Sequence, residues 1–192
     1  MVLLAGCTAT PSAPPPGSSG PPTPPASPIA TDAIEASLLA RPLRLPTVPA
    51  GGACPVSGVT VRSPVAQQAD ARGLGTGPLY PIAFYAGEDA TLRLRGQTPD
   101  PDGLYEVKVV WASTGRHRGP VAVRVGRIDG PGRGFVRLYY DKGASRGDAV
   151  VFPLAEYPSD FPSGTWVSGP GCYAYQIDGV DLMEVIVVRV VA

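Results

Sequence analysis

The sequence predicts an all-β protein, an antiparallel β-sandwich that follows a Pro-rich N-terminal segment. Gly and Pro account for 24 residues each among 192, too many for a helical bundle or a coiled coil. Between residues 42 and 192, short apolar runs of β-type alternate with turn signals. No amphipathic helical pattern separates these runs, so the crossover helices of a parallel sheet are lacking and a sandwich is expected.

Eight to ten strands are expected in this domain. Most runs alternate between apolar and polar residues, whereas the last run is apolar on both faces, which is typical of a strand inside a sheet. The expected strands cover residues 59–62, 79–85, 90–95, 104–111, 121–125, 135–140, 147–152, 164–167, 173–177 and 182–191.

Asp-Gly pairs mark three connections between these runs, beginning at Asp102, Asp129 and Asp178. The pair favours tight hairpins because both residues tolerate a positive φ. A hairpin is expected at each pair, most clearly at Asp178, between runs 173–177 and 182–191.

Residues 32–41 are expected to form a short helix that leads into the sandwich. Asp32 and Glu35 have the spacing of a capping box, and Ile34 and Leu38 lie on one apolar stripe. A helix this short is marginal in water, so it either docks on the sandwich or frays.

Residues 8–31 consist almost entirely of Pro, Ser, Thr, Gly and Ala, with Ile29 as the one large apolar residue. A segment of this composition cannot bury a core. We therefore expect a disordered, extended tether.

Leu4-Ala5-Gly6-Cys7 resembles the lipobox of bacterial lipoproteins. The resemblance implies lipidation at Cys7, a truncated signal peptide at residues 1–7 and a membrane anchor outside the cytoplasm. A full signal peptide has a charged region and an apolar stretch of about 7–15 residues before the box. Either the start lies upstream, as the tether after the cysteine favours, or the match is a chance one in a cytosolic protein.

Sixteen Lys and Arg balance sixteen Asp and Glu, so nothing in the charge attracts nucleic acid. The expected partners are the membrane, through the N-terminal lipid, and an envelope protein or polysaccharide. A monomer is expected.

Cys54 and Cys172 remain once Cys7 is assigned to lipid, and they lie 118 positions apart. In an exported protein such a pair is expected to form a disulfide. The bond would connect the start of the sandwich to its final hairpin and stabilise it by about 4–5 kcal/mol. In a cytosolic protein the alternative is two free thiols.

With Trp111 between them, the two cysteines resemble the Cys–Trp–Cys order of immunoglobulin-like sandwiches, over about residues 56–192. The resemblance implies an immunoglobulin-like topology, although Pro170 stands where that family has a tyrosine. The segment 169–179 is also similar to uncharacterised bacterial lipoproteins, which implies no activity.

Few residues suit catalysis or metal binding. His117 is the one histidine, and its position in a loop between two arginines favours a solvated side chain over a general base. Turn positions explain the candidate carboxylates Asp100, Asp102, Asp129, Asp178 and Asp181. The ligand sets that zinc or calcium requires are lacking. We expect no catalytic residue, metal or cofactor, and no enzyme activity.

Aromatic residues gather in the C-terminal half and form the candidate binding surface: Tyr139, Trp166, Tyr173 and Tyr175. On an exposed face they would stack on sugars or on a protein partner. The alternative is that they pack in the core.

The sequence therefore predicts a lipid-anchored, extracytoplasmic β-sandwich with a non-enzymatic binding role. One alternative is a carboxylate-dependent envelope glycan hydrolase, which needs an acidic pair in a cleft. Another is a purely structural envelope module.

Overall fold

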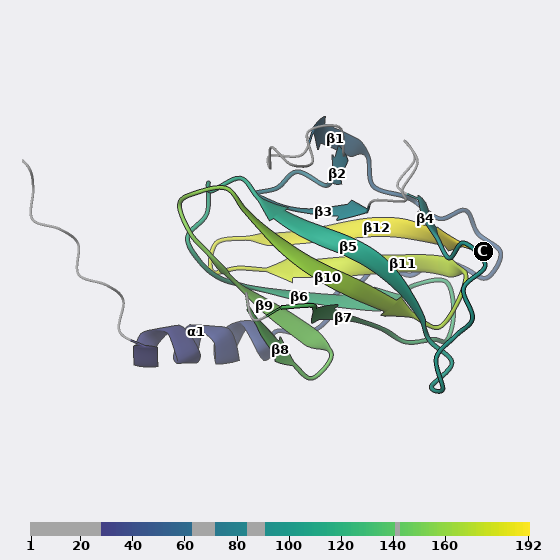
Figure 1. The fold of residues 1–192 in the computed structure, drawn as a ribbon, viewed down its shortest axis with the longest axis horizontal. Helices are drawn as coiled ribbons and strands as arrows, with labels where there is room; N and C mark the ends of the chain where they lie inside the picture. Colours follow the sequence, from purple (N-terminus) through teal and green to yellow (C-terminus); the bar gives the residue numbers. More distant parts are fainter. Residues whose placement is uncertain (1–27, 63–71, 84–90, 141–142) are drawn as a thin grey trace, which may run out of the picture.

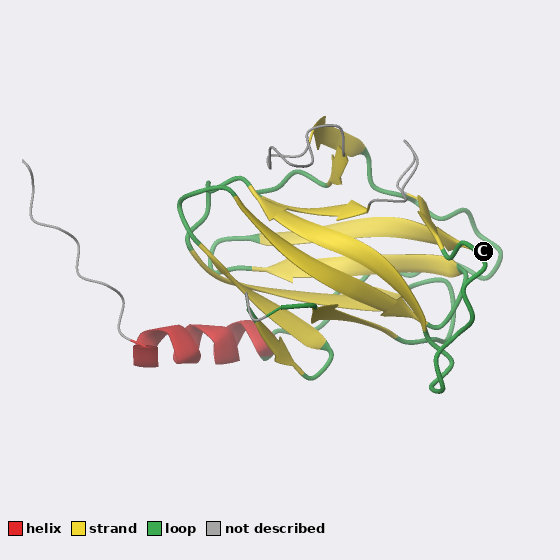
Figure 2. Cartoon of the chain, in the orientation of Figure 1, coloured by secondary structure: helices red, strands yellow, loops and turns green. Residues whose placement is uncertain are grey.

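A computed structural model describes residues 28–62, 72–83, 91–140 and 143–192. These residues form an all-β domain preceded by one helix, α1 (Pro28–Leu39), as Figures 1 and 2 show. The predicted all-β class is therefore confirmed. The lipobox and most of the predicted tether lie outside the described residues.

Two sheets pack face to face, with the four-stranded sheet in front in Figure 1. In spatial order it contains β3 (Leu79–Ala83), β5 (Tyr105–Ser113), β10 (Ser159–Val167) and β7 (Gly134–Leu138). The six-stranded sheet contains β4 (Thr91–Arg93), β12 (Met183–Val191), β11 (Gly171–Asp178), β6 (Gly119–Arg127), β9 (Ala149–Leu154) and β8 (Ala144–Arg146). A two-stranded ribbon of β1 (Val59–Arg62) and β2 (Arg72–Leu74) lies beside β3.

The chain passes from one sheet to the other at most of its connections, so two of the three predicted Asp-Gly hairpins are wrong. The pair at Asp102 joins β4 to β5 and the pair at Asp129 joins β6 to β7, in each case strands of different sheets. An Asp-Gly pair specifies a tight turn but not the partner of the strand that follows it. At Asp178 the hairpin of β11 and β12 is confirmed.

Strand β12 lies between β4 and β11, so the prediction of an interior strand is confirmed. Its pairing with β4 is parallel. The six-stranded sheet is therefore mixed, which corrects the fully antiparallel prediction. No hairpin sets the direction of β4, because the chain reaches it from β3 of the other sheet.

The core between the sheets is built around aromatic side chains. Trp111 meets Tyr175 edge to face, with ring centroids 5.1 Å apart, and it also contacts Phe152 at 5.7 Å. Phe152 in turn contacts Phe161 at 4.9 Å. These contacts connect strands of both sheets, and each large ring removes much apolar surface from water.

Helix α1 docks on the sandwich, which settles the alternative left open by its short length. Leu38 is buried against Ala122 and Val151 on the outer face of the six-stranded sheet. The helix begins at Pro28 rather than near Asp32. Pro suits the first turn of a helix because its missing N–H needs no partner there.

Candidate functional site

The two outer faces of the sandwich are covered very differently. The N-terminal arm, defined here as residues 28–58, lies across the outer face of the six-stranded sheet. Beyond α1, apolar side chains of the arm pack on that face in one cluster with β11, β12 and the end of β6: Leu45, Val48, Cys54, Ile128, Cys172, Ala174, Val185 and Val187.

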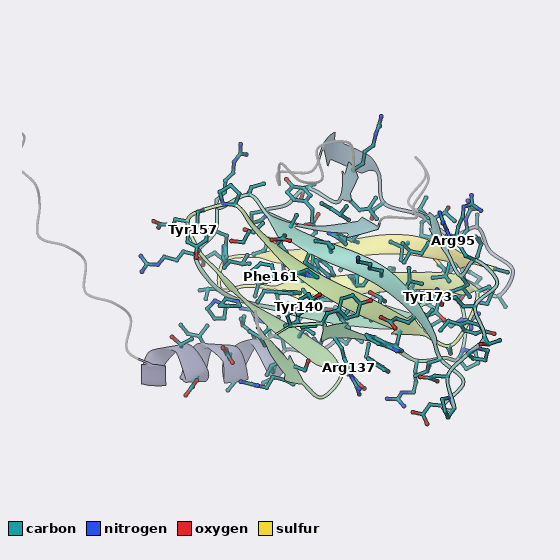
Figure 3. All side chains as sticks on the ribbon, in the orientation of Figure 1. Arg95, Arg137, Tyr140, Tyr157, Phe161 and Tyr173 are labelled. Carbon is teal, nitrogen blue, oxygen red and sulfur yellow. A yellow bond between two sulfur atoms is a disulfide. The ribbon has the colours of Figure 1, made fainter. Side chains whose placement is uncertain are left out.

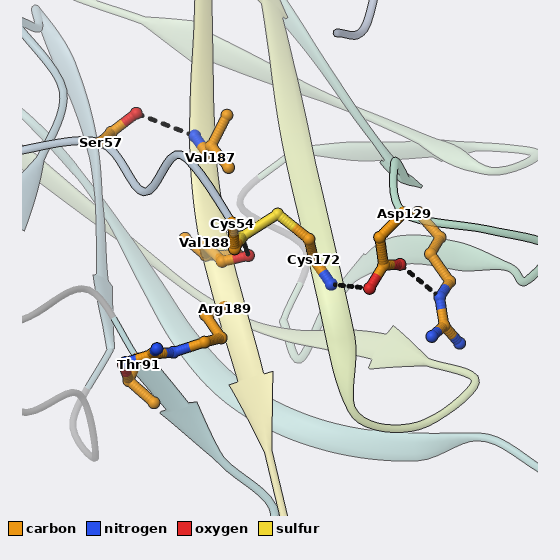
Figure 4. The surroundings of a disulfide bond; sticks show 9 residues. Cys54, Ser57, Thr91, Asp129, Cys172, Val187, Val188 and Arg189 are labelled. Carbon is orange, nitrogen blue, oxygen red and sulfur yellow. Dashed lines mark hydrogen bonds and ion pairs between the residues drawn. A yellow bond between two sulfur atoms is a disulfide. The ribbon is translucent and has the colours of Figure 1, made fainter. Parts of the chain in front are cut away.

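A disulfide between Cys54 and Cys172 attaches the arm to β11, so the predicted pairing is confirmed (Figure 4). Ser57 continues the attachment by exchanging two hydrogen bonds of 2.9 Å with the backbone of Val187 in β12. The disulfide lies on the outer face of one sheet and does not bridge the two sheets as an immunoglobulin disulfide does. Trp111 packs in the core instead, so the Cys–Trp–Cys resemblance does not extend to the geometry.

A buried polar cluster holds the arm just after α1. Asp178 is only 1% exposed and accepts hydrogen bonds from Arg124 at 2.7 Å and from Gln176 at 2.9 Å. The same Arg124 and Gln176 side chains bond to the backbone carbonyls of Arg41 and Pro42. Asp178 was predicted as a turn residue, but here it orients the two side chains that hold the arm.

The ion pair of Arg127 and Asp129 lies beside the disulfide and bonds to Cys172. Asp129 accepts hydrogen bonds from Arg127 Nε at 2.7 Å and from the backbone N–H of Cys172 at 2.9 Å. Burial acts to raise the pKa of Asp129, but its hydrogen bonds and the nearby positive charge of Arg127 together outweigh burial and lower the pKa overall. The hydrogen bond to Asp129 likewise raises the pKa of Arg127.

Two of the four residues predicted to form a binding surface do not lie on the surface. Tyr173 and Tyr175 point into the core and are fully buried. Burial raises the pKa of Tyr175, although its hydroxyl is 2.9 Å from that of Thr165. Both faces of β11 are covered, one by the opposite sheet and the other by the arm, so neither tyrosine reaches a ligand.

The other two predicted residues, Trp166 and Tyr139, do lie together on the outer face of the four-stranded sheet. They line a groove of about 680 Å³ with Glu106, Lys108 and the segment 97–100. The arm, including α1, does not cover this face, which is the one seen in Figure 3.

Strand register explains how the groove is built. Trp166 of β10 lies opposite Glu106 of β5 on one side and Phe135 of β7 on the other. Phe135 stacks on the indole, with centroids 5.3 Å apart and planes 10° apart, and the Arg137 guanidinium lies 4.7 Å from the Phe135 ring. The indole is therefore supported on the side of β7, while its other side borders the groove.

Gly164 leaves room for this arrangement. A Cβ atom at Gly164 would lie 2.6 Å from the benzo ring of Trp166 and 2.6 Å from Glu106 Oε1. Both side chains therefore lean over the bare glycine. Tyr139 reaches across from the other side and donates its hydroxyl proton to Glu106 Oε1. An aromatic wall and a hydrogen-bonded carboxylate thus meet at one point on the open face.

Residues 97–100 and Leu104, before β5, also line the groove. Asp100 Oδ1 accepts backbone N–H groups from Asp102 and Leu104, at 3.0 and 2.8 Å, so this carboxylate stabilises the turn. The missed member of the site is Glu106, since an acidic residue that alternates with apolar ones in a strand is usually just solvated.

His117 lies at the end of the sandwich, away from this groove. It is half-buried beside Gly179 rather than solvated as predicted, and it lines a smaller pocket of about 320 Å³ with Tyr80 and Asp181. Its Nε2 atom is buried without a hydrogen-bond partner among the described residues. Across the part of the chain that the structure describes, no group of three or more His, Cys, Asp and Glu is placed to hold a metal ion.

Comparisons of the chain with protein-family models, curated proteins and solved structures find no match. Within the described ranges, no helix has the length and apolar character needed to cross a membrane. The geometry of the open face is therefore the basis for a functional proposal.

Proposed function

We propose that this protein is a non-enzymatic binding module that holds an envelope polysaccharide on the open face of its four-stranded sheet. The observation that carries the proposal is the meeting of Trp166, Tyr139 and Glu106 in one groove on the uncovered face. The lipobox resemblance and the Pro-rich segment support an anchored position outside the cytoplasm.

The chemistry of the groove matches that of a sugar. The ring C–H groups of a sugar pack against the negative face of an aromatic ring, which Trp166 supplies. Sugar hydroxyls donate to carboxylates, and hydrogen bonds to a charged group are stronger than neutral ones. Glu106 supplies that acceptor, while Lys108 and Tyr139 line the same groove.

Affinity electrophoresis of the full chain tests the proposal, with galactomannan, laminarin and dextran in the gel and purified peptidoglycan sacculi in a pull-down. Trp166→Ala should weaken binding to the recognised polymer about tenfold, roughly the contribution of one aromatic contact. Met183→Ala is the matched control, because Met183 is exposed on the other sheet. The proposal is wrong if no polymer binds, or if Trp166→Ala binds like the wild type.

The hydrolase alternative is tested in the same samples. New reducing ends in the bound polymer, absent with Glu106→Gln, would identify a glycoside hydrolase instead, since such enzymes act through carboxyl groups. A binding module leaves the polymer intact, and Glu106→Gln then only weakens binding, by about fivefold, because a neutral amide replaces the carboxylate.

The membrane anchor is tested separately through Cys7. In a bacterial host that processes lipoproteins, the protein expressed with its upstream region should enter the detergent phase of a phase separation. Cys7→Ser should move it to the aqueous phase. Equal partition of the two forms would overturn the anchor.

A further inference from the structure

We infer that the open face binds an internal stretch of a neutral polysaccharide chain, laid along β10 and held at two subsites. This inference rests on the proposed function and specifies its ligand. The observation behind it is a second groove that also borders β10.

The second groove lies at the start of β10. It has a volume of about 700 Å³, and its lining includes Tyr157, Pro153 and Asp160. Tyr157 is 65% exposed. The ring and hydroxyl of this tyrosine offer the same two kinds of contact, stacking and hydrogen bonding, as the aromatic residues of the first groove.

Both grooves border β10, the first on the side of β5 and the second at the edge of the sandwich, where Pro153 of β9 also lines it. Alternation along a strand places Asp160, Pro162, Gly164 and Trp166 on the same outer face of β10. Asp160 lines the second groove and Trp166 the first. At about 3.3 Å per residue, these two positions are roughly 20 Å apart, longer than a single sugar unit.

Tyrosines lie between the two grooves. The backbone N–H of Tyr139 bonds to the carbonyl of Pro162 at 3.0 Å, so its side chain leaves the chain midway along β10. The next residue, Tyr140, is 65% exposed and lies over the middle of this face, with Tyr157 toward the left in Figure 3. An extended chain lying along β10 would therefore meet aromatic side chains along its whole length.

The charges of the two grooves indicate a neutral ligand. Their lining contains three carboxylates, on Asp100, Glu106 and Asp160, and one ammonium group, on Lys108, while the Arg137 guanidinium lies on the same outer face opposite Gly164. Opposite charges therefore nearly balance along the face, which offers no net attraction to a strongly charged polymer. A hydroxyl-rich, uncharged chain needs no such attraction and can donate to the Glu106 carboxylate.

Two subsites on one rigid strand make affinity depend on ligand length. A ligand that occupies the first groove brings its own extension to the second, so the second contact forms at high effective concentration. A short fragment occupies only one groove and gains nothing from the other.

Isothermal titration of the full chain tests this inference. The ligands are dimer, tetramer and hexamer fragments of whichever neutral polymer of the panel above binds most tightly. Affinity should rise at least tenfold from dimer to hexamer. Tyr157→Ala should lower the hexamer affinity several-fold and leave the dimer affinity unchanged, whereas Trp166→Ala should lower both. Met183→Ala should change neither.

The remaining outcomes show whether the two-subsite inference or the proposed function is wrong. Equal affinity for dimer and hexamer, or a hexamer affinity unaffected by Tyr157→Ala, overturns the two-subsite inference while a loss with Trp166→Ala retains the proposed function. Tighter binding of sodium polygalacturonate than of any neutral polymer, weakened by salt, overturns the neutral ligand. If no polymer binds, both proposals fall and a protein partner becomes the alternative for this face.

Discussion

The two outer faces of this sandwich are built from similar strands, but one is covered by the N-terminal arm and the other is not. The six-stranded sheet presents small and apolar side chains outward, such as Ala122 and Ala174, and the N-terminal arm buries them. The four-stranded sheet presents Trp166, Glu106 and Arg137 outward, and no described segment covers them. The comparison shows that one face contributes to stability, while the other keeps large polar and aromatic groups in water.

The attachment of the arm is also concentrated at a few points. The disulfide holds the arm near its end, the Asp178 cluster holds it just after α1, and apolar contacts lie between these two points. On the open face the interactions of the groove join side chains of β5, β7 and β10 to one another. Substitutions on the covered face should therefore lower mainly the free energy of unfolding. Substitutions on the open face should lower mainly the affinity for the ligand.

Loss of the disulfide should have the largest effect on the covered face. The double variant Cys54→Ser/Cys172→Ser should lose about 4–5 kcal/mol of unfolding free energy, because the bond closes a loop of 118 residues. Urea unfolding measures the loss, and the reduced wild type should show a similar one. A loss under about 1 kcal/mol would mean that apolar contacts alone hold the arm.

Asp178→Asn should have the next largest effect. The change leaves the Arg124 guanidinium, which is 16% exposed, without its buried counter-charge, and about 2–3 kcal/mol of unfolding free energy should be lost. Asp148→Asn is the control, because its ion pair with Arg133 is well exposed and should contribute little. Equal effects of the two variants in urea unfolding would contradict a role of burial.

Gly164→Ala should separate binding from stability on the open face. The added Cβ displaces the Trp166 ring and the Glu106 carboxylate, so affinity for the recognised polymer should fall about tenfold. The free energy of unfolding should change by less than about 1 kcal/mol, because both groups move toward solvent. Gly130→Ala, which meets no neighbouring atom, should alter neither quantity. Unchanged polymer affinity in Gly164→Ala would show that the ring position is unimportant for binding.

Asp129→Asn should have the smallest effect, and the effect should depend on pH. Because the folded state lowers the pKa of Asp129, its carboxylate stabilises the fold above the ordinary pKa of 3.8 and loses that contribution as the pH falls through the lower folded value. At pH 7 the variant should be less stable by under about 1 kcal/mol, since the pair is partly exposed. The difference in unfolding free energy between the two proteins should begin to shrink as the pH falls below about 4, and a constant difference would contradict the assignment.

Much of the fold could be predicted because strands of sufficient length show their alternation. The runs around Trp111, Val123 and Ile186 fall within long strands. Strands β2 and β8 were missed, since three residues show no period. Of the four aromatic residues predicted for a binding surface, Trp166 and Tyr139 line a groove on an outer face, whereas Tyr173 and Tyr175 are buried. Nothing in the local sequence distinguishes the two pairs.

The sequence by itself determined the all-β class, the final hairpin and the pairing of Cys54 with Cys172, because alternation, Asp-Gly turns and cysteine number are local or countable properties. Only the tertiary structure decided which sheet each strand joins and which face the N-terminal arm covers. Those choices depend on contacts between distant segments, such as Asp178 with Arg124. They also decide that the aromatic residues of β11 are buried while Trp166 of β10 remains available to a ligand.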